Sequence, residues 1–350
     1  MTPLLLAALA ATTVSLLFSG AVLATLSRHA RFTLDFPGAA RKAHTRPVPR
    51  VGGAGVYVAL ATARALVRDA EAARILDTVL LAGLPALVAG LLEDLTKQVS
   101  VATRLAGTLA SGALACWIGG MVVTHIDVPG IDGLLAIGVV GFAFTVFAVG
   151  GVANAINMID GFNGLASGAT AIALLAIAAI AAQVGDTALM LAAIVLVGAL
   201  GGFWLLNFPW GKLFLGDGGA YFAGFALAWM AVLLPLRNPS VSPWASLLVC
   251  GYPVIEVGYS VLRRWGHGDR ATGADGGHLH SLVAIRFIQR HLRRLDPTFQ
   301  NSAVSVLMWI CAAIPALLAV TSYGRTSWLA TGALACLLLY HWLYRRLARA

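Results

Sequence analysis

The hydrophobic positions of this chain gather in long runs, without the short alternating or amphipathic patterns that are typical of soluble domains. Each run of roughly 16 to 25 residues is close to the length that a helix needs to cross about 30 Å of hydrocarbon. We predict eleven transmembrane helices, at approximately residues 3–27, 51–67, 77–92, 105–123, 134–152, 166–184, 187–206, 219–235, 244–262, 303–321 and 328–344. Because lipid offers no partner to backbone polar groups, the predicted fold is an all-α polytopic membrane protein, with residues 1–350 forming one integral membrane domain.

Composition agrees with this pattern. The chain is 59% hydrophobic and only 11% charged, with a mean hydropathy of +0.84, whereas charged residues make up about a quarter of soluble domains. These values exclude a soluble two-domain enzyme, a disordered chain and a small disulfide-linked secreted protein.

The charges indicate how the helices are oriented. The first run lacks the cations that precede the apolar part of a signal peptide, so we expect it to remain as a helix. With the amino terminus periplasmic, 19 of the 24 Lys and Arg residues fall on one side, which the positive-inside tendency identifies as the cytoplasm and which also holds the carboxyl terminus. That face would attract anionic lipid or an anionic soluble substrate. Nucleic acid is a poor candidate, because no soluble binding module accompanies the charge.

Polar residues that are hard to explain by structure alone fall on the same side. They form five clusters, at residues 41–53, 90–97, 154–164, 214–219 and 277–280. Taken singly, each cluster can be a topology signal, a turn or a solvated helix end. Yet the chain has only 15 acids and places Glu93, Asp94, Asp160 and Asp217 beside apolar runs on this one face. Ionisable groups next to lipid are costly, which favours a functional site.

The chemistry of these residues suggests a magnesium site. Two adjacent acids, two more from distant loops and the amide of Asn157 supply the oxygen ligands that Mg²⁺ prefers, and Mg²⁺ commonly bridges protein carboxylates to phosphates. Asn157 and Asp160 are three residues apart and would face the same way on a helical turn. Such a site suits phosphoryl transfer between a soluble nucleotide and a lipid phosphate.

With these motifs the chain resembles the polyprenyl-phosphate N-acetylhexosamine-1-phosphate transferases, membrane enzymes of glycosyltransferase family 4. The resemblance runs from about Arg41 to Arg294 and depends most on the stretches Asn157–Gly164 and Phe214–Gly218. It implies a bacterial inner-membrane enzyme whose site faces the cytoplasm and whose partners are a UDP-N-acetylhexosamine, polyprenyl phosphate and Mg²⁺, with Mn²⁺ as a substitute and a homodimer as one assembly. The product would initiate a cell-surface glycan such as O-antigen.

The resemblance also implies roles for single residues. Asp217 matches a metal ligand, Asn157 lies next to the metal and the diphosphate, and Phe214 stacks on uracil, to which Asn163 hydrogen-bonds. The catalytic candidates are Glu93, Asp94, Lys97 and Asp160. Further substrate-binding candidates are Lys42, Arg50, His278, His280 and Arg286.

The chain departs from the family pattern in three places. Glu93 replaces the first acid of a usual Asp-Asp pair, Asn163 replaces an Asp, and a triple-histidine run is reduced to His278-Leu279-His280. The last difference argues against the muramoyl-pentapeptide branch, which remains an alternative, and favours UDP-N-acetylglucosamine or a related hexosamine. We nevertheless expect Glu93 to be an active member of the acidic pair.

Three questions stay open on the sequence. Direct attack by polyprenyl phosphate and double displacement through a covalent acid intermediate both fit the residues. A proton-coupled transporter is the main rival from another class, and Glu256, the acid within a predicted span, is its indicator, although a buried acid bonded to a neighbouring helix explains it better. A catalytically inactive homologue is the third interpretation, suggested by Glu93.

Overall fold

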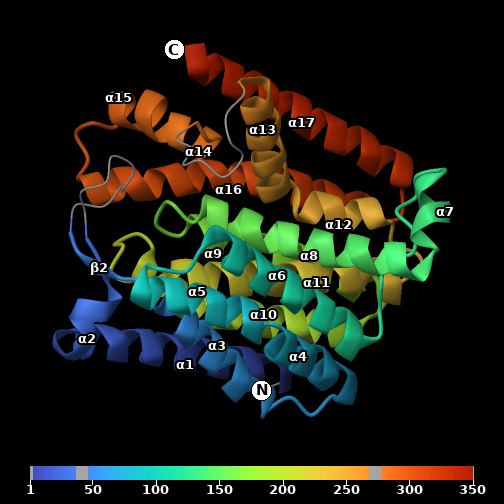
Figure 1. Ribbon diagram of the computed structural model, residues 1–350, viewed down its shortest axis with the longest axis horizontal. Helices are drawn as coiled ribbons and strands as arrows, with labels where there is room; N and C mark the ends of the chain where they lie inside the picture. Colours follow the sequence, from blue (N-terminus) through green and yellow to red (C-terminus); the bar gives the residue numbers. More distant parts are fainter. Residues whose placement is uncertain (1–2, 37–45, 268–276, 350) are drawn as a thin grey trace.

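The computed structural model describes residues 3–36, 46–267 and 277–349, and this part of the chain is almost entirely helical (Figure 1). The first half contains α1 (Pro3–Ala24), α2 (Leu26–Thr33), β1 (Leu34–Asp35), β2 (Val48–Pro49), α3 (Gly52–Arg64), α4 (Ala70–Ala82), α5 (Leu84–Thr96), α6 (Val101–Gly119), α7 (Ile131–Leu135) and α8 (Gly138–Ile159). The second half contains α9 (Leu165–Val184), α10 (Thr187–Asn207), α11 (Gly216–Arg237), α12 (Pro243–Val249), α13 (Gly251–His267), α14 (Leu279–Leu282), the π-helix η1 (Val283–Ile288), α15 (Gln289–His291), α16 (Pro297–Ser322) and α17 (Thr326–Arg349).

Eight to ten of the eleven predicted spans correspond, within the described residues, to helices long and apolar enough to cross a membrane. Within the described residues, eight single helices meet this condition, and two bent pairs bring the number to ten if each pair is one span. The pairs are α4 with α5, bent by 41°, and α12 with α13, bent by 78°. The remaining run, at residues 51–67, forms α3, whose 13 residues extend only about 20 Å. The all-α membrane fold is therefore confirmed, whereas the count of eleven spans is not.

The chain passes back and forth between two ends of the bundle. At one end, Arg50 and Asn157 both reach Asp217. At the other end, Arg237 binds Asp186 through two hydrogen bonds of 2.7 and 3.0 Å, and so joins the end of α11 to the α9–α10 connection. The loops that carry the predicted polar clusters 90–97, 154–164 and 214–219 all lie at the first end, which is on the left in Figure 1.

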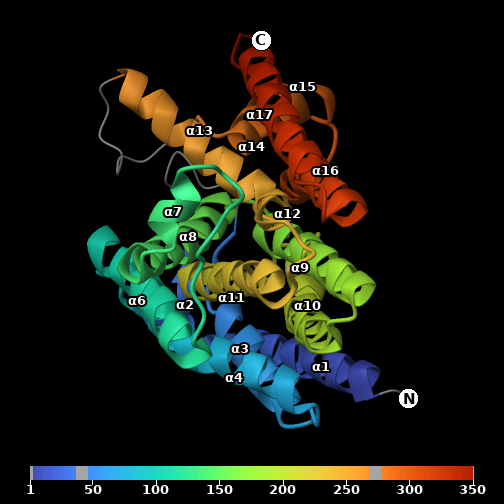
Figure 2. The ribbon, with the colours of Figure 1, turned by 90° about the vertical axis from the view of Figure 1, so that its right-hand side faces the viewer.

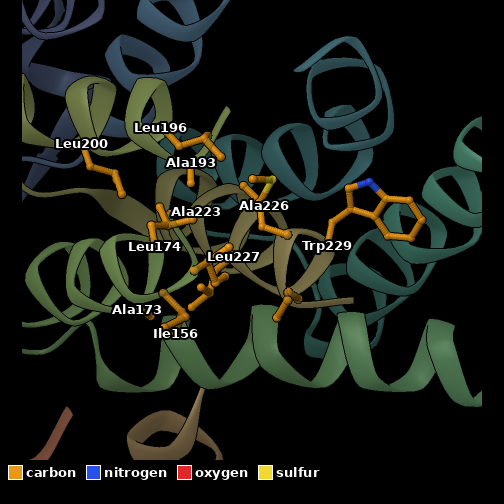
Figure 3. Packing of buried hydrophobic residues seen from close by; sticks show 14 of the residues in the cluster. Ile156, Ala173, Leu174, Ala193, Leu196, Leu200, Ala223, Ala226, Leu227 and Trp229 are labelled. Carbon is orange, nitrogen blue, oxygen red and sulfur yellow. The ribbon is translucent and has the colours of Figure 1, made fainter. Parts of the chain in front are cut away.

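Helix α11 forms the centre of the bundle, with α3, α6, α8, α9, α10 and α12 around it (Figure 2). Of its most apolar 18-residue window, 94% is buried inside the protein. Figure 3 shows Leu227 of α11 among Ile156 of α8, Leu174 of α9 and Leu196 of α10. A helix that is apolar on all sides is expected in such a central position.

Glycines bring α3 and α5 into backbone contact with the amino end of α11. A Cβ atom added to Gly53 would lie 2.1 Å from the Cα of Gly219, and one added to Gly90 would lie 2.3 Å from the backbone nitrogen of Gly218. Small residues allow this close approach between membrane helices. The position of Asp217, at the start of α11, is therefore fixed by backbone packing.

A short sheet completes this end. β1 and β2 are antiparallel, with Leu34 opposite Pro49. The carbonyl of Pro49 accepts a hydrogen bond from the N–H of Phe214 at 2.8 Å, and the carbonyl of Phe214 accepts one from the N–H of Gly52 at 3.0 Å. These bonds hold Arg50, between β2 and α3, next to the loop that precedes α11.

Candidate active site

Asp217 is the point on which the polar groups of this end converge. Its Oδ1 accepts hydrogen bonds from Arg50 Nη2 at 3.1 Å and from Asn157 Nδ2 at 3.2 Å, while Arg104 Nη1 donates to its Oδ2. The side chain keeps 14% of its surface exposed. Three elements far apart in sequence therefore hold one accessible carboxylate between two cations.

Asp94 lies behind Asp217 and is fully buried. Its Oδ1 accepts the backbone N–H of Asp217 at 2.9 Å, and its Oδ2 accepts that of Gly218 at 3.0 Å. A carboxylate there satisfies free amides of the first turn of α11 and also complements the positive end of the helix dipole. This explains why an acid stands at the carboxyl end of α5, where the dipole of α5 itself disfavours it.

Arg50 connects the acids of the site. Its Nη2 lies 3.2 Å from Asp94 Oδ1 as well as 3.1 Å from Asp217 Oδ1, and its Nη1 lies 3.8 Å from Asp35 Oδ1. Burial disfavours the charge of the guanidinium, but Asp94, Asp217 and Asp35 outweigh that cost, so the pKa of Arg50 is raised above its usual value. Arg50, a predicted substrate-binding residue, is thus a charged component of the site.

Two cavities open at this end of the bundle. The first has a volume of about 210 Å³, and its lining includes Asp35, Arg50, Asn157, Asp160, Phe214 and Asp217. The second, of about 280 Å³, carries the cations Arg46 and Lys212. Phe214 and Asn163 line both. The sequence prediction that Asn157 and Asp160 share one face is confirmed, since both line the first cavity together with Asp217.

Asp160 lies directly after α8 and has a raised pKa. Burial, together with the negative charge of Asp217, raises the pKa of Asp160 to about 7, although Arg50 opposes the shift. A carboxyl group with this pKa exchanges its proton near neutral pH.

Asn163 lines the cavities but uses its polar groups to hold the chain. Its side-chain Nδ2 donates to Ser302 Oγ at 3.1 Å and to the carbonyl of Pro209 at 3.3 Å, and its backbone N–H donates to Asn301 Oδ1 at 2.7 Å. Only 4% of the residue is exposed. In the structure Asn163 therefore ties the loop after α8 to α16, and its expected hydrogen bond to uracil stays a prediction.

The other residues of the paired-acid motif lie outside these two cavities. Glu93 Oε2 accepts the backbone N–H of Val99 at 2.8 Å, which stabilises the turn between α5 and α6. Lys97 has a positive φ of 56° and donates from Nζ to the carbonyl of Leu34 at 2.9 Å. Both side chains connect loops next to the site, and their catalytic roles remain predictions.

The two histidines form a buried pair beside the first cavity. Their rings are parallel, with centroids 5.1 Å apart, and the ring of His280 packs edge-on against Phe162, which lines that cavity. Glu256 of α13 accepts the backbone N–H of Leu279 at 2.8 Å and lies 3.3 Å from His278 Nδ1. The interpretation of Glu256 as a buried acid bonded to a neighbouring segment is confirmed.

One predicted substrate-binding residue, Arg286, is not brought to these two cavities. Arg286 is exposed on η1 and lines neither cavity. Lys42 lies outside the described residues.

Sequence reasoning missed several residues that build the site. Arg104 was counted only as a topology charge, although its place one helix turn into α6 puts it beside Asp217. Asn207 accepts the N–H of Gly164 and donates to the carbonyl of Leu213 at 2.7 Å, which joins two loops. Asn207 could have been predicted as a site residue, because it is a polar amide at the end of the apolar run 187–206. Asn301 and Glu256 gave no signal of their partners, because these partners are distant in sequence.

Comparisons with known proteins point to one enzyme family. The model of the family described as glycosyl transferase family 4 matches residues 77–235, a range that includes Asp94, Asn157, Asp160 and Asp217. The chain is similar to a protein of Bacillus subtilis (strain 168) named probable undecaprenyl-phosphate N-acetylglucosaminyl 1-phosphate transferase, with 24% identity over 241 residues. The match covers 69% of this chain and 66% of that relative, just under two thirds of its length.

Proposed function

We propose that the chain is a member of glycosyl transferase family 4, whose model matches residues 77–235, and that it transfers N-acetylhexosamine-1-phosphate from a UDP-sugar to polyprenyl phosphate and releases UMP. N-acetylglucosamine is the sugar that we favour, in line with the name of the Bacillus subtilis relative. The product would be the first lipid-linked intermediate of a cell-surface glycan such as O-antigen.

The observation that carries the proposal is the shared cavity of Asp217, Asp160, Asn157, Arg50 and Phe214 at one end of a membrane bundle. The cavity contains charges of both signs and an aromatic face. A nucleoside diphosphate sugar needs these features, because its base stacks and its phosphates pair with cations. The carboxyl end of α8 and the amino end of α11 meet there. A site at the ends of apolar helices supports the proposal that a lipid phosphate and a water-soluble nucleotide both reach it.

The carboxylates fit a magnesium ion as part of the proposal. No group of three or more His, Cys, Asp or Glu side chains converges in a metal-ligand arrangement within the described ranges. Mg²⁺ commonly takes only one or two protein carboxylates and completes its shell with substrate phosphates and water. Asp217 and Asp160 line the same cavity, where burial, together with the negative charge of Asp217, raises the pKa of Asp160. They would hold the ion with Asn157 nearby, and bound Mg²⁺ would neutralise phosphate charge.

The residues of the chain account for binding and orientation. Arg50 offers a guanidinium to a phosphate if it exchanges one of its carboxylate partners, since it lines the cavity as well as bonding to Asp217. Phe214 offers its ring to the base from either cavity. Asp94 keeps the start of α11, and therefore Asp217, in place.

The proposed reaction exchanges one phosphoanhydride for another. An oxygen of polyprenyl phosphate attacks the phosphorus that carries the sugar, the bond from that phosphorus to the oxygen of UMP breaks, and the sugar C1–O bond stays intact. The free-energy change should be small, and the reaction should be reversible. Double displacement through a carboxylate, with Asp217 or Asp160 as nucleophile, gives the same products.

The proposed location is the bacterial cytoplasmic membrane, with this end of the bundle in the cytoplasm. The exposed cations Arg46 and Lys212 lie at that end, as the positive-inside tendency requires for a cytoplasmic face.

A transfer assay tests the function. Purified protein is incubated with radiolabelled UDP-N-acetylglucosamine, polyprenyl phosphate and Mg²⁺, and the lipid is then extracted. We expect labelled lipid, together with exchange of labelled UMP into UDP-sugar that requires polyprenyl phosphate. Parallel reactions with UDP-N-acetylgalactosamine and UDP-N-acetylmuramoyl-pentapeptide identify the sugar. Label that stays in water with every sugar, or sugar uptake into vesicles without lipid product, would overturn the proposal.

A further inference from the structure

One face of α16 binds the backbone of the loop between α8 and α9. Asn301 Oδ1 accepts the N–H of Asn163 at 2.7 Å, and Ser305 Oγ donates to the carbonyl of Asn163 at 2.7 Å. Trp309 Nε1 donates to the carbonyl of Gly164 at 3.1 Å. The three α16 residues are spaced four apart, and residues at this spacing lie on the same side of a helix. They therefore form one polar row, aimed at one short segment of the loop.

Ser305 uses its hydroxyl for the loop and not for its own helix. Hydroxyl groups in apolar helices commonly bond to the carbonyl four residues earlier in the same helix, as those of Thr145 in α8 and Thr321 in α16 do. Ser305 is fully buried and donates to the carbonyl of Asn163 instead. A requirement of α16 alone does not explain this bond.

The packing of α9 leaves room for Trp309 to reach the loop. α16 packs against α9, the helix that follows the loop. A Cβ atom added to Gly168 of α9 would lie 2.3 Å from Trp309 Nε1. This separation is shorter than a van der Waals contact, so a larger residue at this position would displace the indole nitrogen from the carbonyl of Gly164.

The loop that α16 binds also carries Asp160. Asp160 follows α8, three residues before Asn163, and lines the first cavity together with Asp217. The three α16 residues lie outside the range that the family model matches, because that match ends at residue 235. A helix beyond the matched range thus binds the loop of an acid within it.

We infer that Ser305 and Trp309 are positioning residues, which hold the loop after α8 in the geometry that presents Asp160 to the first cavity. Neither side chain lines that cavity, so we expect both to act through the loop. The link to catalysis rests on the proposed function, whereas the link to the loop is independent of any activity. Removal of either donor leaves a backbone carbonyl with one hydrogen bond fewer, which is costly in a buried place. The loop should then open more often.

The first experiment measures opening of the loop by hydrogen exchange and mass spectrometry, in peptides that contain residues 160–165. Ser305→Ala and Trp309→Phe each remove a donor and leave most of the side chain in place. We expect both to speed exchange of the loop amides about fivefold or more. Gly168→Ala, which displaces the indole of Trp309, should have the same effect.

Two variants serve as matched controls. Thr321→Val removes a hydroxyl that bonds to carbonyls of α16 itself. Gly201→Ala adds a methyl group where nothing else packs within 4 Å. Both should exchange as wild type does. Wild-type exchange in either Ser305→Ala or Trp309→Phe would remove that residue from the positioning role, and wild-type exchange in both would overturn the inference.

The second experiment measures kinetics in the transfer assay. We expect kcat to fall about tenfold or more in Ser305→Ala, because a small displacement of a catalytic group is costly in rate, while the KM for the UDP-sugar, whose base is assigned to Phe214, stays within about twofold. Ser305→Thr keeps the hydroxyl and should recover part of kcat. Thr321→Val, Gly201→Ala and Glu71→Gln, which alters an acid at the opposite end of the bundle, should retain wild-type kcat.

The outcomes separate the inference from the proposed function. A wild-type protein that transfers no sugar phosphate contradicts the function, and hydrogen exchange still decides whether α16 holds the loop. Faster exchange with unaltered kcat in an active protein contradicts the positioning role alone. If Ser305→Ala does not fold, Trp309→Phe and Gly168→Ala provide the same test, and wild-type exchange and kcat in both would overturn the inference.

Discussion

Asp94 holds Asp217 in place through the backbone: both oxygens of the fully buried Asp94 accept N–H groups of the turn that carries Asp217. The two acids therefore differ in kind, although both belong to the predicted acidic site. Asp217 faces the cavity with its carboxylate, whereas Asp94 acts as a cap for α11 and as a partner of Arg50. Substitutions should separate these roles.

We expect Asp94→Asn to lower both stability and activity. The asparagine side chain has only one acceptor oxygen, whereas both oxygens of Asp94 accept a backbone N–H. Its NH₂ group would therefore face one of these N–H groups, which would lose its hydrogen-bond acceptor. Loss of a buried hydrogen bond to a charged group costs about 1.5 to 3 kcal/mol, which for a chain of 350 residues corresponds to a fall in melting temperature of about 2 to 4 °C. Thermal unfolding in detergent checks this, and a wild-type melting temperature would show that Asp94 is not an important cap.

We expect Asp217→Asn to abolish turnover and to leave the fold intact. The amide fills the same space but removes the negative charge between Arg50 and Arg104. Removal of a principal electrostatic group costs about a hundredfold or more in rate. The transfer assay and a melting temperature within a few degrees of wild type check the prediction, with Glu71→Gln as control. Activity near the wild-type level would place the site elsewhere.

Glu93→Gln tests the role of the unusual first acid. The glutamine carbonyl can still accept the N–H of Val99, so the turn after α5 should be preserved and any effect should come from the lost charge. Because Glu93 lies outside the two cavities, we expect a smaller loss of activity than for Asp217→Asn, with Glu93→Asp closer to wild type. A loss as large as that of Asp217→Asn would restore Glu93 to direct catalysis, and no loss at all would make it a turn residue.

Phe214→Ala should weaken nucleotide use selectively. Stacking on a base contributes about 1 to 3 kcal/mol, so the KM for the UDP-sugar should rise about five- to hundredfold while that for polyprenyl phosphate changes little. Phe142→Ala, an exposed aromatic near the other end of α8, is the control. Steady-state kinetics with each substrate varied in turn decide the matter, and an unchanged KM for the nucleotide would place uracil away from Phe214.

The raised pKa of Asp160 predicts that the stability of the protein depends on pH. The pKa of Asp160 is raised by burial to about 7 in the folded protein, from 3.8 for a free aspartate side chain. The folded state therefore binds this proton more tightly than the unfolded chain does, and the stabilising contribution is complete below about pH 4 and lost as the pH rises through about 7. The melting temperature of Asp160→Asn, relative to wild type, should rise between about pH 5 and pH 8. Excess Mg²⁺ at about pH 8 should stabilise wild type more than the variant, and a parallel response of both proteins would contradict the assignment.

The sequence predicted the membrane bundle well because each apolar run reports directly on burial in lipid. It did not indicate that the run at residues 51–67 forms only the 13-residue α3, which packs on α1 and α10. The sequence also predicted that Asp160 and Asp217 belong to one site, and both line the first cavity. The signal was the free-energy cost of placing an ionisable group beside an apolar run. The sequence could not predict the hydrogen-bond partners of Asp94 and Glu256, because a backbone amide has no sequence signature. The partners of Asp94 are 123 and 124 residues away, and the partner of Glu256 is 23 residues away.

The glycine contacts at the start of α11 bear on how this protein loses its activity when heated. Gly53 and Gly90 leave no side-chain layer between α3, α5 and α11, so the turn that carries Asp217 cannot open while these helices stay together. Many enzymes carry catalytic groups on loops that unfold locally before the rest of the molecule. We therefore expect the turn that carries Asp217 to unfold together with the central helix, so that loss of the proposed activity on heating should coincide with global unfolding.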